Sequence, residues 1–163
     1  MLTGADDYIA KPFNTQFLLT RCNNLVNSRA VLQEKFSRFP NTSTTSLATN
    51  PLDKKFLDKA TAIIEENMEN NEFNISLFAQ EMAMSRTNLF SKMKAITGQT
   101  PNDFIMTMRL KKGAALLREA PEMSIAEISE RIGFNSSKYF SRRFFEVYNI
   151  RPLNYRKGIT GQA

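Results

Sequence analysis

The chain has 163 residues, 42% of them hydrophobic, and a formal net charge of +6. This length allows one packed domain with attachments, and the hydrophobic content argues against a disordered chain. Histidine is absent, which excludes imidazole zinc ligands, phosphohistidine and the Ser-His or Cys-His pairs of nucleophilic enzymes. The acidic residues are scattered along helical faces without a paired arrangement, so we predict no enzyme activity and no metal or other cofactor.

The sequence also predicts where the protein resides. No apolar run is long enough to form a membrane-spanning helix, and the acidic first residues are unlike a secretory signal peptide. The single cysteine, Cys22, cannot form an internal disulfide, which fits a reducing compartment. We therefore expect a cytoplasmic fragment without membrane contact.

The N-terminal segment, residues 1–39, begins with a short motif. Residues 4–13 resemble the last strand of a response-regulator receiver domain. The resemblance implies that Lys11 and Pro12 are a receiver remnant: in intact receivers the matching lysine contacts the phosphorylated aspartate, and its bond to proline is often cis. The upstream acidic cluster and phosphoacceptor of receivers are missing here, so this chain is not expected to be phosphorylated as a receiver is. The other interpretation is a short amphipathic extension without receiver ancestry.

The receiver resemblance implies a longer parent protein, a two-component regulator that carries sensor and regulator on one chain and that a membrane anchor would suit. For the segment itself we predict a long helix at about 14–36 and an unpaired or poorly ordered strand at 7–11, because one strand cannot build a receiver core. Exposed Phe17, Leu18 and Leu25 would favour self-association, so a homodimer is one expected arrangement.

Residues 40–51 are almost all small, polar and uncharged, which predicts a flexible linker. The domain that follows, residues 52–158, is predicted to be all-α with seven helices, and residues 159–163 form a tail. Apolar spacing and capping residues place the helices at about 52–69, 77–82, 86–97, 101–118, 125–133, 137–148 and 152–156. The predicted caps are Ser76, Ser85, Thr100 and Ser124 at helix starts and Gly98 at a helix end.

An internal repeat organises this domain. Apolar and proline positions recur 51 residues apart, in the pairs Leu89 and Phe140, Met93 and Phe144, and Pro101 and Pro152. Each copy consists of a short helix, a tight turn, a longer basic helix and a helix opened by proline. This order predicts two helix-turn-helix units, at about 76–97 and 124–148, joined by a linker helix at about 101–118.

Charge alternates in sign along the same segments. Residues 53–82 carry 3 basic and 7 acidic residues, a net of −4, and residues 83–118 carry 7 and 1, a net of +6. Residues 119–135 carry 1 and 4, a net of −3, and residues 136–163 carry 6 and 1, a net of +5. A solvated surface does not need such segregation, whereas a protein that places particular helices against phosphate does.

A helix-turn-helix unit places different demands on its two helices. The first supports the second and must be apolar on its inner side, a requirement met by Leu77, Phe78 and Met82 and again by Ile125, Ile128 and Ile132. The second, the recognition helix, buries one stripe and presents a polar, basic face. A lone basic helix face is more often simply solvated, but two at matching positions of a repeat favour double-stranded DNA as the partner.

The residue types on these faces divide into two roles. Side chains at the first turn usually meet base edges, so we assign base contacts to Arg86, Thr87, Asn88, Ser137 and Lys138. The assigned phosphate contacts are Ser85, Ser91, Lys92, Lys94, Ser136, Ser141, Arg142 and Arg143.

Residues 125–145 and 151–156 closely resemble the signature of AraC-type transcription regulators, and residues 84–101 resemble the first half of the same domain. The resemblance covers roughly residues 53–157. It implies two helix-turn-helix units, joined by a long helix, that insert their recognition helices into successive major-groove segments on one DNA face. Departures are Asn149 for the usual Gly, Arg151 for a frequent Thr, and Ser91 where many relatives carry a basic residue.

These observations predict sequence-specific DNA binding by a transcription regulator of a two-component phosphorelay, located at the nucleoid. RNA polymerase would be a further partner if the protein is an activator. One alternative is a protein-interaction adaptor that kept the fold and lost DNA binding; it would show loss of positive charge from both recognition helices, and both remain basic. An enzyme is the third hypothesis, and no catalytic constellation supports it.

Overall fold

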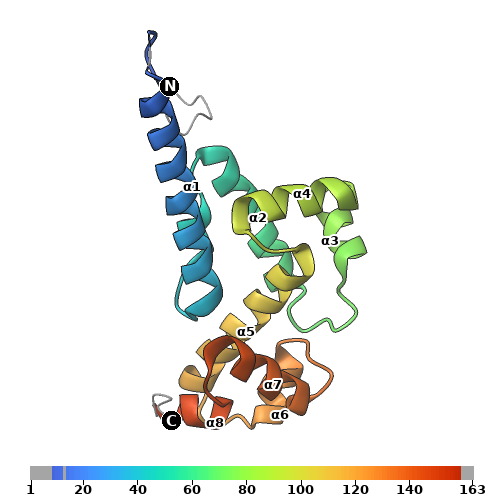
Figure 1. Cartoon of the computed structure of the whole chain (residues 1–163). Helices are drawn as coiled ribbons and strands as arrows, with labels where there is room; N and C mark the ends of the chain where they lie inside the picture. Colours follow the sequence, from blue (N-terminus) through green and yellow to red (C-terminus); the bar gives the residue numbers. More distant parts are fainter. Residues whose placement is uncertain (1–8, 13, 159–163) are drawn as a thin grey trace.

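The computed structural model describes residues 9–12 and 14–158, which contain eight α-helices, one short 3-10 helix (η1) and no strand (Figure 1). The all-α prediction is therefore confirmed, with seven helices, α2 to α8, in the C-terminal domain. In chain order the elements are α1 (Thr15–Arg38), η1 (Thr44–Leu47), α2 (Pro51–Glu66), α3 (Ile75–Glu81), α4 (Arg86–Thr97), α5 (Pro101–Glu119), α6 (Ile125–Arg131), α7 (Ser137–Tyr148) and α8 (Pro152–Arg156).

Capping side chains explain where these helices begin. Ser85, Thr100 and Ser124 each accept a hydrogen bond from the backbone N–H three residues later, as predicted, and Ser124 and Glu127 complete a capping box. The hydrogen bonds from Ser124 lower the pKa of the Glu127 carboxyl. Ser76 was wrongly predicted as a cap, because the Asn74 carboxamide accepts from the N–H groups of Ser76 and Leu77 and starts α3 earlier.

Two hydrophobic cores divide the molecule into two lobes, and α5 passes through both (Figure 1). The first lobe packs α1 to α4 around the N-terminal half of α5, where Phe104 is fully buried. The second lobe packs α6, α7 and α8 around its C-terminal half, where Leu117 is fully buried. Gly113 permits close contact there, since a Cβ at this position would lie 2.9 Å from Ile132 Cδ1 and 3.0 Å from Phe140 Cε2.

The predicted flexible linker differs from the structure. Within residues 40–51, η1 is capped by the Ser43 hydroxyl, and Leu47 is 1% exposed between α1 and α2. Leu47 is the one large apolar residue of this polar segment, and burying such a side chain contributes about 2 kcal/mol. That contribution offsets part of the entropy lost when the segment is ordered, and through Leu47 the segment forms part of the first lobe.

The N-terminal segment is also more integrated than predicted. Phe36 of α1 is fully buried and stacks on Phe104, with ring centroids 5.7 Å apart. Phe17 and Leu25 are exposed as expected, whereas Leu18 is half-buried. The predicted strand at 7–11 begins outside the described residues, and its described part, residues 9–11, forms no strand. The Lys11–Pro12 peptide bond is cis, and no described helix has the length and apolar character needed to cross a bilayer.

Candidate nucleic-acid interface

The two predicted helix-turn-helix units have matching backbone geometry. Ala83 and Gly133 occupy the turns with φ values of 56° and 75°. In each turn the next residue makes the same backbone hydrogen bond, to the residue five positions earlier. Met84 N–H donates to Ala79 O, and Phe134 N–H donates to Ser129 O, both at 2.9 Å. The two copies of the repeat therefore share their backbone geometry as well as their sequence pattern.

The recognition helices α4 and α7 also end alike. Gly98 and Asn149, 51 residues apart, both adopt left-handed conformations, with φ values of 73° and 56°. Asparagine tolerates this conformation better than other residues with a side chain. The departure at Asn149 therefore leaves the helix end unchanged.

Each recognition helix buries the predicted stripe. Leu89 and Met93 of α4 are fully buried, as are Phe140 and Phe144 of α7. The supporting helices α3 and α6 are buried through Phe78 and Ala79 and through Ile128 and Ser129. The prediction for Leu77 was wrong: it is 39% exposed, and the buried residues of α3 are Phe78 and Ala79.

The assigned residues of α4 lie on its solvent side. Exposed side chains are those of Arg86, Thr87, Asn88, Ser91, Lys92 and Lys94. The Lys92 side chain points toward α2, and its ammonium lies 4.8 Å from the centre of the Phe56 ring. The Ser85 hydroxyl accepts from the Asn88 N–H, so it serves the helix start, and any phosphate contact would be made by its remaining O–H.

The assigned residues of α7 are less uniformly exposed. Lys138 and Arg142 are exposed, whereas Ser137, Ser141 and Arg143 are half-buried. The Ser136 hydroxyl caps the helix by accepting from the Tyr139 N–H at 3.4 Å.

Glu146 partly neutralises the cations of α7. Its carboxylate lies 2.6 Å from Arg143 Nη1 and 3.7 Å from Arg142 Nε. The Arg142 guanidinium also lies 5.2 Å from the centre of the Tyr139 ring. The pair with the exposed Arg142 is of a kind that contributes little to stability.

Two exposed phenylalanines on the recognition helices were missed by the sequence analysis. Phe90 on α4 is 47% exposed and Phe145 on α7 is 46% exposed. Phe90 lies one helical turn from Arg86 and one from Lys94, so an apolar group sits between two cations. The sequence could have indicated their exposure, because Phe90 lies off the buried stripe of Leu89 and Phe145 lies off the buried stripe of Phe140.

Arg109, also missed, joins the first lobe to the second unit from inside. It is 9% exposed, and its guanidinium donates to Gly133 O at 3.1 Å and to Asn70 O at 2.8 Å. Burial lowers the pKa of this guanidinium, while the two carbonyl oxygens stabilise its charged form. One side chain of α5 thereby connects the loop before α3 to the turn of the second unit.

A family profile described as a helix-turn-helix domain matches residues 78–158. An AraC-type DNA-binding-domain regulator from Chromobacterium violaceum has a solved structure that superposes with a TM-score of 0.61 at 25% identity, covering 70% of this chain and 100% of that one. Residues 78–158 therefore match a helix-turn-helix domain family, and the chain has the fold of an AraC-type DNA-binding domain.

Two further relatives extend the comparison beyond the AraC-type domain. Histidine kinase P4 of Formosa agariphila is 41% identical over 98% of this chain, which spans 12% of that protein. The C-terminal domain of the two-component response regulator yesN from Fusobacterium nucleatum is 29% identical, with a TM-score of 0.55, over 61% of this chain and 95% of that one.

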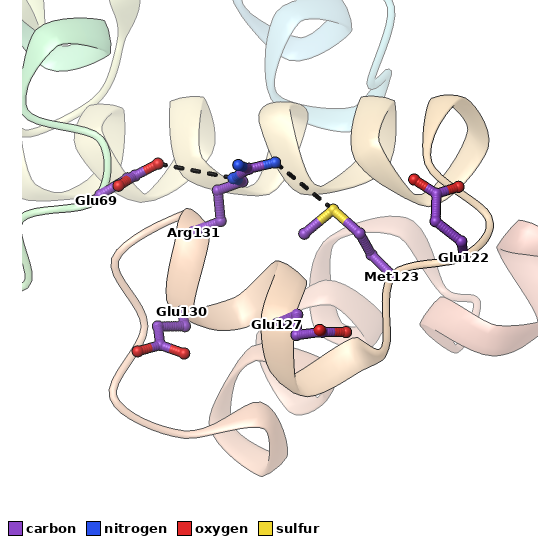
Figure 2. A pocket seen from close by; sticks show the side chains of 6 residues that line it. All are labelled: Glu69, Glu122, Met123, Glu127, Glu130 and Arg131. Atoms are coloured by element: carbon purple, nitrogen blue, oxygen red, sulfur yellow. Dashed lines mark hydrogen bonds and ion pairs between the residues drawn. The ribbon is translucent and has the colours of Figure 1, made fainter.

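An acidic pocket lies at the side of α6 (Figure 2). It is lined by Met123, Arg131 and four glutamates, Glu69, Glu122, Glu127 and Glu130. Arg131 pairs with Glu69 at 3.7 Å and contacts the Met123 sulfur at 3.8 Å. The described residues contain no group of acidic or cysteine side chains arranged to hold a metal ion. This acidic surface would repel phosphate groups.

Proposed function

We propose that this AraC-type domain binds double-stranded DNA sequence-specifically, as the output module of a transcription regulator. The observation that carries the proposal is the doubled architecture: α4 and α7 bury apolar stripes at matching positions, and each exposes cationic side chains on its other side. Both helices have retained positive charge, which argues against an adaptor that lost DNA binding.

Within the proposed interface the side chains have two roles. Arg86, Thr87, Asn88, Ser137 and Lys138 contact base edges from the first turns of α4 and α7, where Asn88 suits adenine and the cations suit guanine. Lys94, Arg142 and the flanking Lys92 and Arg143 neutralise phosphates and supply most of the affinity. The serines, including Ser85, Ser91, Ser136 and Ser141, add hydrogen bonds to phosphate oxygens.

The parent protein is proposed to act in a two-component phosphorelay. This rests on the relatives named as a histidine kinase and as a two-component response regulator, and on the resemblance of residues 4–13 to a receiver strand. The exposed Phe17 and Leu25 of α1 support self-association of the parent as a homodimer. RNA polymerase is the further partner of an activator.

Selection of bound sequences from random duplex DNA, at two salt concentrations, tests the function, and two variants then test the roles. Arg142→Ala should weaken binding to all sequences and reduce the salt slope by about one, because one phosphate contact is lost. Asn88→Ala should relax the preference at one base position, with a loss of about 1–3 kcal/mol for the selected site. If Asn88→Ala weakened every sequence equally, the base-contact role would be wrong, and recovery of random sequences by the wild type would contradict the function itself.

A further inference from the structure

Helix α1 lies against both lobes, near the two recognition helices (Figure 1). On the first lobe, Gln33 Nε2 donates to Ile96 O at 3.0 Å and more weakly to Ala95 O at 3.5 Å. Those are carbonyls of the last turn of α4, which have no partner within the helix. On the second lobe α1 contacts α7 directly.

The C-terminal end of α1 is fixed by further contacts to α5. The Lys111 ammonium donates to the carbonyl oxygens of Phe39 and Pro40, and it lies 4.4 Å from the centre of the buried Phe36 ring. Ser37 accepts a hydrogen bond from Gln99 Nε2 at 2.8 Å. These bonds join the end of α1 to the middle of α5, the helix that passes through both lobes.

The end of α4 is shaped to receive Gln33. A Cβ at Gly98 would lie 2.7 Å from Gln33 Oε1. The absent side chain at Gly98 thus serves the approach of α1 as well as the left-handed φ of 73°. By contrast, the corresponding cap on α7 is Asn149, which is exposed.

We propose that α1 sets the separation and relative rotation of α4 and α7, and thereby determines which spacing between two DNA segments the protein accepts. The inference rests on the proposed DNA-binding function. Its physical reason is that the lobes have separate cores, so their relative placement depends on the few elements that touch both. Those elements are α5, with Arg109, and α1, which bonds the end of α4 through Gln33, is held to α5 by Lys111, and contacts α7.

The test uses the full chain and two pairs of variants. Gln33→Ala removes the bonds to the end of α4, and Lys111→Met removes the bonds to residues 39 and 40 while keeping an apolar stem against Phe36. The matched controls are Asn27→Ala, on an exposed position of α1, and Lys112→Met, which removes the same charge from the exposed neighbour of Lys111. Affinity is measured for duplexes in which the two selected segments are separated by the preferred spacing, by one base pair more or by one fewer.

We expect the wild type and both controls to prefer one spacing at least about tenfold, which is the effect of roughly 1.4 kcal/mol. Gln33→Ala and Lys111→Met should reduce that preference at least threefold, with affinity for a single segment unchanged within twofold. Equal weakening on all duplexes, with the preference intact, would overturn the proposal, because α1 would then only support folding.

A second measurement needs no DNA. Spin labels at Asn88→Cys and Lys138→Cys, in a Cys22→Ser background, report the distance between α4 and α7. The distribution should be narrow in the wild type and the controls, and broader or shifted in Gln33→Ala and Lys111→Met. Identical distributions in all proteins would overturn the positioning role. Absence of any DNA preference in the wild type would instead overturn the proposed function and leave this distance result standing on its own.

Discussion

At the scale of single residues, Ala83 and Gly133 occupy the same position in the turns of the two helix-turn-helix units. Both have a left-handed backbone, but Ala83 is exposed, whereas Gly133 is buried against Met68 and Arg109. An L-residue with a Cβ costs roughly 1–2 kcal/mol in this conformation. The first unit therefore retains a local strain that the second avoids.

Ala83→Gly should stabilise the protein by about 0.5–1 kcal/mol, because the relief of strain exceeds the added entropy of the unfolded chain. Gly133→Ala should destabilise it by about 2 kcal/mol or more, since its Cβ would lie 2.5 Å from the Met68 carbonyl oxygen, which is backbone. Urea unfolding of both variants checks the pair. A loss of stability in Ala83→Gly would contradict the assignment of strain.

Phe90 is expected to contact a thymine methyl group, because it is an exposed aromatic side chain on the polar side of α4, between two cations. Replacing one thymine of the selected site by deoxyuridine, which lacks only that methyl, should lower wild-type affinity about fourfold, the effect of one buried methyl group. Phe90→Ala should bind both duplexes equally. Wild-type binding that is indifferent to every such replacement would refute this contact.

At the scale of elements, α5 is the helix on which the second lobe is assembled. Gly113 lies in its interior, where alanine normally improves a helix by about 1 kcal/mol. Here the added Cβ would meet Ile132 Cδ1 at 2.9 Å and the fully buried Phe140 ring at 3.0 Å. Packing between α5, α6 and α7 therefore decides the outcome, against local propensity.

Gly113→Ala should lower the free energy of unfolding by about 1–2 kcal/mol, the cost of overpacking less the gain in propensity. Ala115→Gly, on the half-buried side of the same helix, provides the comparison for propensity alone. Chemical denaturation of both variants checks the prediction. If Gly113→Ala stabilised the protein, α6 and α7 would be able to move away from the added Cβ at no cost in free energy, and the prediction would be wrong.

At the scale of the whole molecule, Lys111 connects the N-terminal segment to α5, and burial lowers its pKa from 10.5 to about 8. The folded state then binds fewer protons than the unfolded state between these two values. Stability should therefore rise with pH from about 8 to 10.5, and the full cost of the charge applies below that range. This change of stability with pH is opposite in sign to that of a lysine held in an ion pair.

Thermal unfolding of the wild type and Lys111→Met across this pH range isolates the effect, since the other groups titrate in both proteins. The difference in unfolding free energy should shift in favour of the wild type as pH rises. A shift in favour of Lys111→Met would mean that the carbonyl oxygens and the Phe36 ring hold the lysine charged in the fold.

The bounds of α4 and α7 followed directly from sequence, because Ser85, Gly98, Ser136 and Asn149 act through bonds to residues within a few positions. Local capping was misjudged once, at Asn74. Assignment of Arg86, Asn88 and Arg142 to an exposed face was also possible, since burial of Leu89 and Phe140 fixes the orientation of each helix. Their contacts with bases and phosphates stay predictions.

The docking of residues 15–47 and the burial of Arg109 were decided only by tertiary structure. In the sequence, Leu47 lies in a polar segment predicted to be a linker, and Gln33 and Phe36 lie in a helix predicted to stand alone. Their partners are in α2, α5 and the end of α4, far away in the chain. Sequence by itself determined the α-helices, most of their caps and the doubled helix-turn-helix pattern, because those depend on interactions a few residues apart. The joining of the two lobes depends on contacts between residues far apart in the chain, and no local pattern encodes them.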